Sequence, residues 1–211
     1  MSALRVVTHA GTALQAFLPD IARLRIKVFR DWPYLYDGDA AYEQRYLQTY
    51  IDTPEAMVAI CFDGDRVVGA STALPLAAET TTIQRPFVGA ASTDTERSAS
   101  PLPALQETLY LGESVLDPAY RGRGIGVEFF ARREAHARRL GLRHGVFCAV
   151  QRASDDPRRP IGHVALDGFW RHRGYAPLPG CTTRLSWREI GADSESAQTM
   201  QFWHRSLGEA G

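Results

Sequence analysis

The chain has 211 residues, enough for one substantial core and too few for two full domains. Lysine plus arginine and aspartate plus glutamate balance at 24 each, so no overall field directs the protein to nucleic acid or to an anionic membrane. Hydrophobic residues make up 45%, which argues against a disordered chain. No stretch approaches the roughly 20 apolar residues of a membrane helix, and residues Met1 to Phe17 resemble no leader peptide. We therefore expect a cytoplasmic protein of one domain.

The cysteines and histidines suggest no metal chemistry. Cys61, Cys148 and Cys181 are odd in number, far apart and set in strand-like sequence, which predicts buried thiols rather than nucleophiles. The six histidines have no metal-type spacing with one another or with cysteine. No metal site is predicted.

The first half of the chain predicts one strand, two helices and then a tight hairpin of two strands. Pro19 interrupts the first helix, so that helix is either two pieces or begins at Pro19. The predicted elements are a strand over Ala3 to Thr8, a helix over Thr12 to Phe29, a helix over Asp39 to Tyr50 capped by Asp37 or Asp39, and strands over Met57 to Phe62 and Arg66 to Ala73 around Asp63-Gly64-Asp65.

Residues Pro75 to Pro103 break this pattern, since they are rich in Ala, Thr, Ser and Pro. Only Ile83 to Val88 suggests local order. The segment is predicted to be an insertion in the domain.

The second half predicts further strands and helices, ending in a helical tail. The order of elements indicates a mixed α/β layer rather than a doubly wound repeat. The predicted elements are a strand over Thr108 to Leu116, a helix over Gly124 to Leu140, a strand over Gly145 to Val150, a loop over Gln151 to Pro160, a helix over Ile161 to Arg173, a strand pair over Tyr175 to Pro177 and Thr182 to Trp187, and a helix over Ser194 to Leu207 with Met200, Trp203 and Leu207 on one face.

A glycine-rich turn between a strand and a helix is the most informative motif. Gly122, Gly124 and Gly126 allow the backbone N–H groups to approach a ligand closely, and Arg121 and Arg123 supply charge. The following helix start favours an anion, so the junction predicts a pyrophosphate site. No Gly-Lys-Ser/Thr follows, and the glycine spacing differs from the dinucleotide fingerprint, so neither of those phosphate loops fits.

The motif Arg121-x-x-Gly124-x-Gly126 resembles the acetyl-coenzyme A loop of the GCN5-related N-acetyltransferases. Arg25-Ile-Lys-Val-Phe29 resembles the family's Arg-x-x-Val-Phe segment, and Phe169-Trp-Arg-His-Arg-Gly-Tyr175 is similar to its Leu-Tyr-x-x-x-Gly-Phe. With the order of elements, the resemblance extends over residues 3 to 188. It implies a mixed, mostly antiparallel sheet flanked by helices, formed by a single domain over residues 1–190 with an insertion at about 75–103. Residues 191–211 are expected to form a helix that packs on this domain.

The resemblance also implies an activity, the transfer of the acetyl group of acetyl-CoA to a primary amine of a small molecule or peptide. Nucleic acid and membrane partners are not expected, and a homodimer is left open. The implied coenzyme A residues are Val115 or Leu116, whose backbone N–H would polarise the thioester carbonyl, together with Arg121, Gly122, Arg123, Gly124, Ile125, Gly126, Val127 and His163.

An amine with a pKa of about 10.4 must lose a proton before it attacks a thioester. Relatives use a Glu or His for this at the position of Tyr110, so the predicted order of bases here is Glu113, then Tyr110, then Glu107. Alternatively, Glu113 only pairs with Arg121 or another cation, and catalysis uses solvent. Alternation along a strand puts Glu113 and Tyr110 on opposite faces.

Family members often assist thiolate departure with a tyrosine, but here Trp170 occupies that position and has no phenol to donate a proton. Tyr175, Tyr120 and Tyr110 are the candidate substitutes, or packed aromatics. Trp170 also favours a second reading, an acyl-CoA-binding module that has lost turnover. A third is a transferase of longer acyl groups.

The resemblance places the acceptor amine between the first two helices and the final strands. Trp32, Tyr34 and Tyr36 are the predicted lining, or aromatics that pin a loop to the core. The insertion is expected to cover that side of the cleft, unless it is only a surface loop. Replacing Ala77 to Ser100 with a short linker is then expected to leave the fold intact and to change the acceptor KM.

Overall fold

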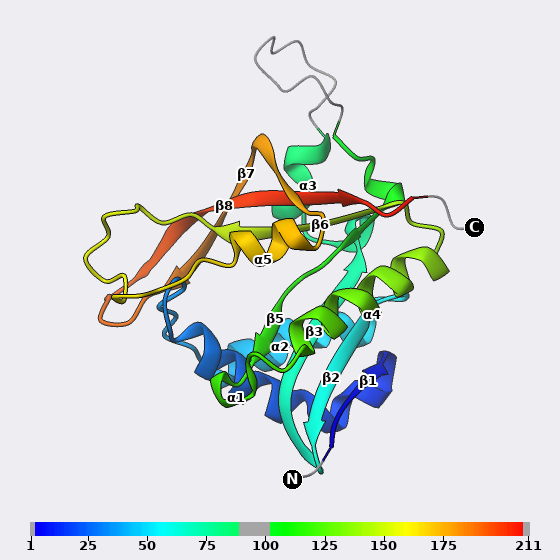
Figure 1. Cartoon of the computed structure of the whole chain (residues 1–211), viewed down its shortest axis with the longest axis horizontal. Helices are drawn as coiled ribbons and strands as arrows, with labels where there is room; N and C mark the ends of the chain where they lie inside the picture. The colour runs from blue at the N-terminus through cyan, green and yellow to red at the C-terminus, as the bar shows by residue number, and fades with distance from the viewer. Residues whose placement is uncertain (1–2, 89–101, 209–211) are drawn as a thin grey trace.

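The computed structural model describes residues 3–88 and 102–208 of the chain (Figure 1). Within those residues, eight strands form one sheet in the order β1-β2-β3-β4-β6-β8-β7, and β5 pairs with β3 beside this path. Only β4 and β6 pair in parallel, so the sheet is mixed and mostly antiparallel, and the predicted fold class is confirmed.

The strands are β1 Leu4–His9, β2 Met57–Asp63, β3 Arg66–Pro75, β4 Thr108–Tyr110, β5 Ser114–Leu116, β6 His144–Val150, β7 Ala176–Arg188 and β8 Glu195–Ser206. The α-helices are α1 Leu18–Phe29, α2 Ala40–Asp52, α3 Thr81–Val88, α4 Ile125–Arg139 and α5 Asp167–His172. Short 3-10 turns are η1 Gly11–Phe17, η2 Leu76–Ala78, η3 Leu105–Glu107 and η4 Pro118–Tyr120. Over 3–88 and 102–208, none of the helices has the length and apolar character needed to cross a bilayer.

Two hydrophobic cores lie on the two faces of the sheet, as the alternation along β2 shows. Val58, Ile60 and Phe62 belong to one core and Met57 and Cys61 to the other, because successive strand residues point to opposite faces. Helices α1, α2 and α3 supply the first core, and α4 covers the second (Figure 1). The prediction of buried thiols is confirmed for all three cysteines.

Local sequence signals explain where the helices on the first face begin. Pro19 lies in the first turn of α1, where its missing N–H removes no helical hydrogen bond. Asp39 caps α2 by accepting a hydrogen bond from the Tyr42 N–H at 2.8 Å. The predictions of an early break at Pro19 and a cap at Asp39 are confirmed.

The predicted C-terminal helix is wrong, because Glu195–Ser206 form strand β8 between β6 and β7. Both faces of β8 are covered. Met200 and Phe202 enter the first core, whereas Trp203 enters the second. A strand buried on both faces carries apolar residues on both, so its sequence does not alternate strictly between apolar and polar. The three-residue spacing of Met200 and Trp203 therefore also fits one face of a helix.

Two other predictions need correction. The helix predicted over Ile161 to Arg173 is present only as α5, Asp167–His172. The preceding Ile161, Val164 and Leu166 are exposed, so no apolar face of that segment packs on the sheet and supports a helix. The strand predicted over Thr108 to Leu116 is two strands, β4 and β5, separated at residues 111–113.

The start of the predicted insertion is packed rather than peripheral. Ile83 and Phe87 of α3 are buried in the first core, and the Phe87 ring lies 4.9 Å from that of Phe202. The Thr183 hydroxyl donates to the carbonyl of Thr82 at 2.7 Å. The remainder of the insertion, residues 89–101, lies outside the described residues, so the prediction that it covers the cleft remains a prediction.

Candidate active site

The sheet splits where β4 ends. Tyr110 is opposite Val146 in the parallel pair, and the Leu111 N–H still donates to the Val146 carbonyl at 2.7 Å. Beyond that point β5 pairs with β3 and β6 pairs with β8, among the residues that the structure describes. The two strands therefore diverge and leave an opening between β5 and the second half of β6.

A β-bulge at Gly112 causes this divergence. The Gly112 N–H donates to the Thr72 carbonyl at 3.1 Å, and the Thr72 N–H donates to the Glu113 carbonyl at 2.9 Å. Two residues, Gly112 and Glu113, are therefore opposite the single residue Thr72 of β3, as in a β-bulge. A Cβ at Gly112 would lie 2.4 Å from the Tyr50 hydroxyl and 2.5 Å from the Thr72 hydroxyl. Only glycine fits there. The sequence signal was Gly112 itself, inside an apparently continuous strand.

The pairing of β5 decides which backbone N–H groups face the opening. Glu113 and Asp117 both make backbone hydrogen bonds to β3: the Glu113 carbonyl accepts from the Thr72 N–H, and the Asp117 N–H donates to the Val68 carbonyl. Val115 lies midway between these two residues. Every second residue of an antiparallel strand bonds to the same neighbour, so Val115 also directs its N–H to β3. The N–H groups of Ser114 and Leu116 point the other way. Of the two predicted carbonyl-polarising groups, the geometry favours Leu116.

The glycine-rich turn lies at the end of β5 and leads directly into α4. Gly122 and Gly124 have φ values of +74° and +80°, in the left-handed region that favours glycine, and a Cβ on either would meet nothing within 4 Å. The Glu128 N–H makes the first helical bond, to Gly124. The amides of Ile125, Gly126 and Val127 precede it in the first turn, where helical N–H groups have no partner within the helix. This open backbone surface fits a pyrophosphate group.

The two arginines of the glycine-rich turn differ in whether their side chains are free to contact a ligand. Arg121 is exposed beside the glycines, whereas Arg123 folds back to donate to the Ala119 carbonyl at 3.2 Å. His163 lies on the loop before α5, with its ring 6.2 Å from that of Trp32. It is half-buried and is not on a helix. Its predicted role toward coenzyme A stays a prediction.

Glu113 is held by a buried network rather than left free. One carboxylate oxygen pairs with the Arg25 guanidinium, and the other accepts a hydrogen bond from the Tyr46 hydroxyl at 2.7 Å. Arg25 also pairs with Glu43, whose side chain is 0% exposed. The alternative of an ion pair thus matches the geometry, with Arg25 as the cation instead of Arg121. Arg25 is also the first residue of the Arg-x-x-Val-Phe segment.

The candidate tyrosines are occupied by other contacts. Tyr110 is buried, its hydroxyl lies 3.2 Å from the Cys148 sulfur, and burial raises its pKa well above the usual value. Tyr175 is buried and donates to Glu134 at 3.2 Å, and burial raises its pKa too. Tyr120 donates to Asp63 at 2.8 Å. Burial also raises the pKa of the Cys148 thiol, to about 12, which suits an inert thiol.

Trp170 has a packing role in the second core. Its ring lies 5.1 Å from that of Phe147 and 5.0 Å from that of Trp203. The neighbouring Phe169 contacts the start of α4, where a Cβ on Gly126 would be 3.3 Å from its ring. This packing fixes α5 against the glycine-rich turn.

Glu79 is a carboxylate near the opening that the sequence analysis did not single out. It follows η2, and its electrostatic neighbours include Glu113, Tyr50 and Tyr110. Burial, and then the charge of Glu113, raise the pKa of Glu79. The third sequence candidate, Glu107, is exposed in η3 at the opposite end of β4. Glu79 lies in the predicted insertion, where no strand or helix pattern marked it.

The three predicted acceptor aromatics have different surroundings. The Tyr34 ring packs between Phe29 and Trp187, and its carbonyl accepts from the Trp187 indole at 2.9 Å. The Trp32 ring lies beneath the Arg152 guanidinium, 5.8 Å away. Tyr36 lines a pocket beside α2. Tyr34 thus fits the alternative of a loop pinned to the core.

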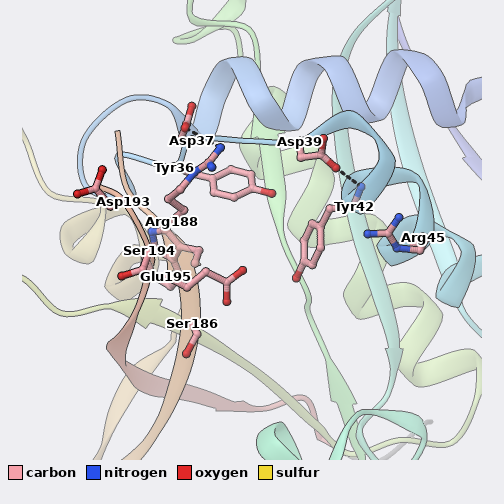
Figure 2. A pocket seen from close by; sticks show the side chains of 11 residues that line it. Tyr36, Asp37, Asp39, Tyr42, Arg45, Ser186, Arg188, Asp193, Ser194 and Glu195 are labelled. Carbon is pink, nitrogen blue, oxygen red and sulfur yellow. Dashed lines mark hydrogen bonds and ion pairs between the residues drawn. The ribbon is translucent and has the colours of Figure 1, made fainter. Parts of the chain in front are cut away.

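That pocket has a volume of about 470 Å³ and opens between α2 and the β7–β8 hairpin (Figure 2). Figure 2 shows Tyr42 reaching into it from the α2 side and Glu195 from the hairpin side. Its lining consists of Tyr36, Asp37, Asp39, Tyr42, Arg45, Ser186, Trp187, Arg188, Asp193, Ser194 and Glu195. The hairpin residues were missed because the tail was predicted to be helical.

Comparison with known families gives the class of protein that this fold and site define. The model of the acetyltransferase (GNAT) family matches residues 21–161, which include the opening, the glycine-rich turn and α4. The match covers more than half of the chain. The chain therefore belongs to the GNAT acetyltransferase family, and the family resemblance seen in the sequence is confirmed.

Solved structures agree on the fold. A ribosomal-protein-alanine N-acetyltransferase from Brucella melitensis has a TM-score of 0.58 at 14% identity, over 95% of this chain and 99% of that one. A putative acetyltransferase from Acinetobacter baylyi has a TM-score of 0.61 at 12% identity, over 99% of this chain and 94% of that one. The yncA putative acetyltransferase from Salmonella typhimurium was solved with acetyl-CoA. It has a TM-score of 0.57 at 13% identity, over 99% of this chain and 96% of that one. A comparison with curated protein sequences found no significant match.

Proposed function

We propose that the protein transfers the acetyl group of acetyl-CoA to a primary amine of a small molecule or peptide. The observation that carries the proposal is the opening between β5 and β6 with the glycine-rich turn at its end. A bound acetyl-CoA would supply the activated acetyl thioester. Arg121 and the amides from Gly122 to Val127 would hold its pyrophosphate, and the outward N–H of Leu116 would bind the thioester carbonyl oxygen.

The amine must pass its proton to a base close to the opening. Among the described residues, Glu113 and Glu79 are the candidate carboxylates. Glu113 is anchored by Arg25 and Tyr46, whereas the ordered contact of the Glu79 carboxylate is the Thr80 N–H at 2.9 Å. A base works best with a pKa near the working pH. We therefore assign proton removal to Glu79 and give Glu113 the task of holding the bulge and Arg25.

Binding of the cofactor can be tested at the glycine turn. Gly124→Asp places a negative charge and a strained residue at the pyrophosphate position, so coenzyme A affinity measured by calorimetry should fall at least about tenfold, or ~1.4 kcal/mol. Gly141→Asp is the matched control. Gly141 also has a positive φ, +73°, and open space around its Cβ, but it follows the far end of α4. Equal affinities for the two variants would refute the site.

A second candidate function is an acyl-CoA-binding module without turnover. The positions of Trp170, Tyr175 and Tyr110 favour it, because none offers an exposed phenol to protonate the departing thiolate. Incubation with acetyl-CoA and a panel of amines, with detection of free thiol, separates the two. Amine-dependent thiol release supports the transferase. Tight coenzyme A binding without release supports the binding module.

A further inference from the structure

The pocket between α2 and the β7–β8 hairpin is more acidic than the protein as a whole. Its lining has four carboxylates and two arginines, a net charge of −2, in a chain whose formal net charge is zero. Arg188 is already paired with Asp37 at 2.9 Å. Among the lining residues, this leaves Arg45 as the remaining cation for Asp39, Asp193 and Glu195. Outside the lining, Arg30 also lies 3.7 Å from Asp37. The pocket thus has an excess of negative charge at its hairpin and α2 walls.

Aromatic side chains form the rest of the wall. Tyr36, Tyr42 and Trp187 all line the pocket, and Tyr42 is 47% exposed although its ring is large. Burial, and then the neighbouring Glu43, raise the pKa of Tyr36, so its phenol stays neutral. Aromatic faces next to carboxylates attract an organic ammonium group by cation–π and Coulomb interactions. The same carboxylates repel an anionic ligand.

A buried charge network lies behind the pocket. The Glu43 side chain is completely buried, and the Tyr36 phenol hydrogen-bonds to it. Glu43 and Glu113 share one cation, Arg25. Two carboxylates with one cation give this network a formal negative charge, which favours a positive ligand nearby. The contacts from Tyr36 through Glu43 and Arg25 to Glu113 connect the pocket with the opening in the sheet.

We propose that the acceptor is a small amine with a second positive charge, such as an α,ω-diamine. One amine would enter the opening beside β5, and the distal ammonium would bind among Tyr36, Tyr42, Asp193 and Glu195. The proposal rests on the proposed acetyl transfer and names the acceptor class for the same site.

The test compares amines that differ only in the distal charge. Linear diamines of three to eight carbons are each paired with the monoamine of equal length, with acetyl-CoA as donor. For the best-fitting length, kcat/KM should favour the diamine by about tenfold or more, as expected for one ion pair with cation–π support. Calorimetry with coenzyme A present measures binding of the same amines without turnover.

Variants show whether the pocket causes that preference. The double variant Asp193→Asn/Glu195→Gln should bring the ratio of diamine to monoamine kcat/KM close to one, chiefly by lowering the value for the diamine. The double variant Asp52→Asn/Asp65→Asn is the control. It removes the same number of exposed charges, at the end of α2 and at the β2–β3 turn, and should keep the ratio.

Each outcome separates this inference from the proposed function. Acetylation of both amines with equal efficiency, or a preference that survives the pocket variant, overturns the inference and leaves the transferase standing. Selective calorimetric binding of the diamine without turnover of either amine supports the ligand class and refutes the transferase. Equal or undetectable binding of the two amines, without turnover, counts against both. A lysine-rich peptide that exceeds every diamine in kcat/KM overturns the small-molecule assignment.

Discussion

Arg25 links the first two helices to the bulge beside the opening. It is buried between two carboxylates, and its guanidinium also lies over the Tyr46 ring, 4.3 Å from the ring centre. Burial of such a group is costly unless partners surround it, so the cluster stabilises only as a unit. Because α1 contributes Arg25, α2 contributes Glu43 and the bulge contributes Glu113, this cluster ties the first helices to the opening.

A prediction at this scale concerns the base. Glu79→Gln should lower kcat/KM by about 100-fold at pH 7 and far less at pH 9.5, because more acceptor amine is already neutral at high pH. Glu113→Gln should lower it by a similar factor at both pH values, since it disturbs the position of Arg25 and the bulge. Full pH–rate profiles of the two variants provide the measurement.

The opposite pattern would restore the assignment made from the sequence. If the loss in Glu113→Gln disappears at pH 9.5 while Glu79→Gln follows the wild-type profile, Glu113 is the base. Parallel profiles for both variants would leave proton removal to solvent.

At the scale of elements, the bulge between β4 and β5 is the feature that opens the sheet. Gly112→Ala drives a methyl group into the Tyr50 and Thr72 hydroxyls, so we expect a loss of about 1–3 kcal/mol in the free energy of unfolding, and reduced turnover. Gly168→Ala in α5 meets no atom within 4 Å and serves as the control. It should be neutral or slightly stabilising. Urea titrations of the two variants would show the difference, and equal stabilities would contradict the bulge packing.

The pairing of β6 with β8 contains a histidine contact that makes stability depend on pH. His144 Nδ1 and His204 Nε2 lie 3.0 Å apart, and burial together with His144 lowers the pKa of His204 to about 4. The unfolded chain, with a histidine pKa near 6.5, binds more protons between these values. The stabilisation is therefore present above pH 6.5 and lost as the pH falls toward 4.

We expect this loss to be on the order of 1 kcal/mol, since His204 is only partly shielded from solvent. The free energy of unfolding, measured by urea titration between pH 7 and pH 4, should fall less steeply in His204→Asn than in the wild type. His172→Asn, at an exposed position of α5, should keep the wild-type slope. His9 and His136 also have lowered pKa values, so some slope should remain. A slope unchanged by His204→Asn would exclude this contact as the cause.

At the scale of the whole molecule, the first part of the predicted insertion, α3, packs against the first core and β7. Replacement of residues 77–100 removes Ile83 and Phe87 from the first core and Thr82 from its contact with β7, so we expect a loss of at least about 3 kcal/mol. The expectation that this deletion leaves the fold intact is therefore revised. Replacement of residues 90–100 keeps α3 and should preserve both the fold and coenzyme A affinity. A changed acceptor KM in this shorter deletion would support the covering role, and an unchanged KM would refute it.

Local signals in the sequence were sufficient to predict several turns and helix starts correctly. The hairpin at Asp63-Gly64-Asp65, the cap at Asp39 and the glycine turn before α4 each depend on residues adjacent in the chain. Strand β8 was misassigned because its residues are covered on both faces, and this depends on partners far away in the sequence. The helix predicted at α5 was too long. Apolar residues at helical spacing form a helix only where they have a surface to pack on, and the exposed Ile161 and Val164 have none.

The sequence by itself determined the family, the glycine-rich turn before α4 and the order of most elements, because glycine conformation, helix starts and hydrophobic periodicity are local properties. Tertiary structure alone decided what Glu113 contacts. It brought Arg25, Glu43 and Glu113 together from separate elements, and it turned the N–H of Leu116 outward through the register of β5 with β3. It also created the acidic pocket, whose walls are about 150 residues apart in the chain. Pairing and burial at such separations leave no periodic trace in the sequence, which is why the partners of these side chains follow only from the fold.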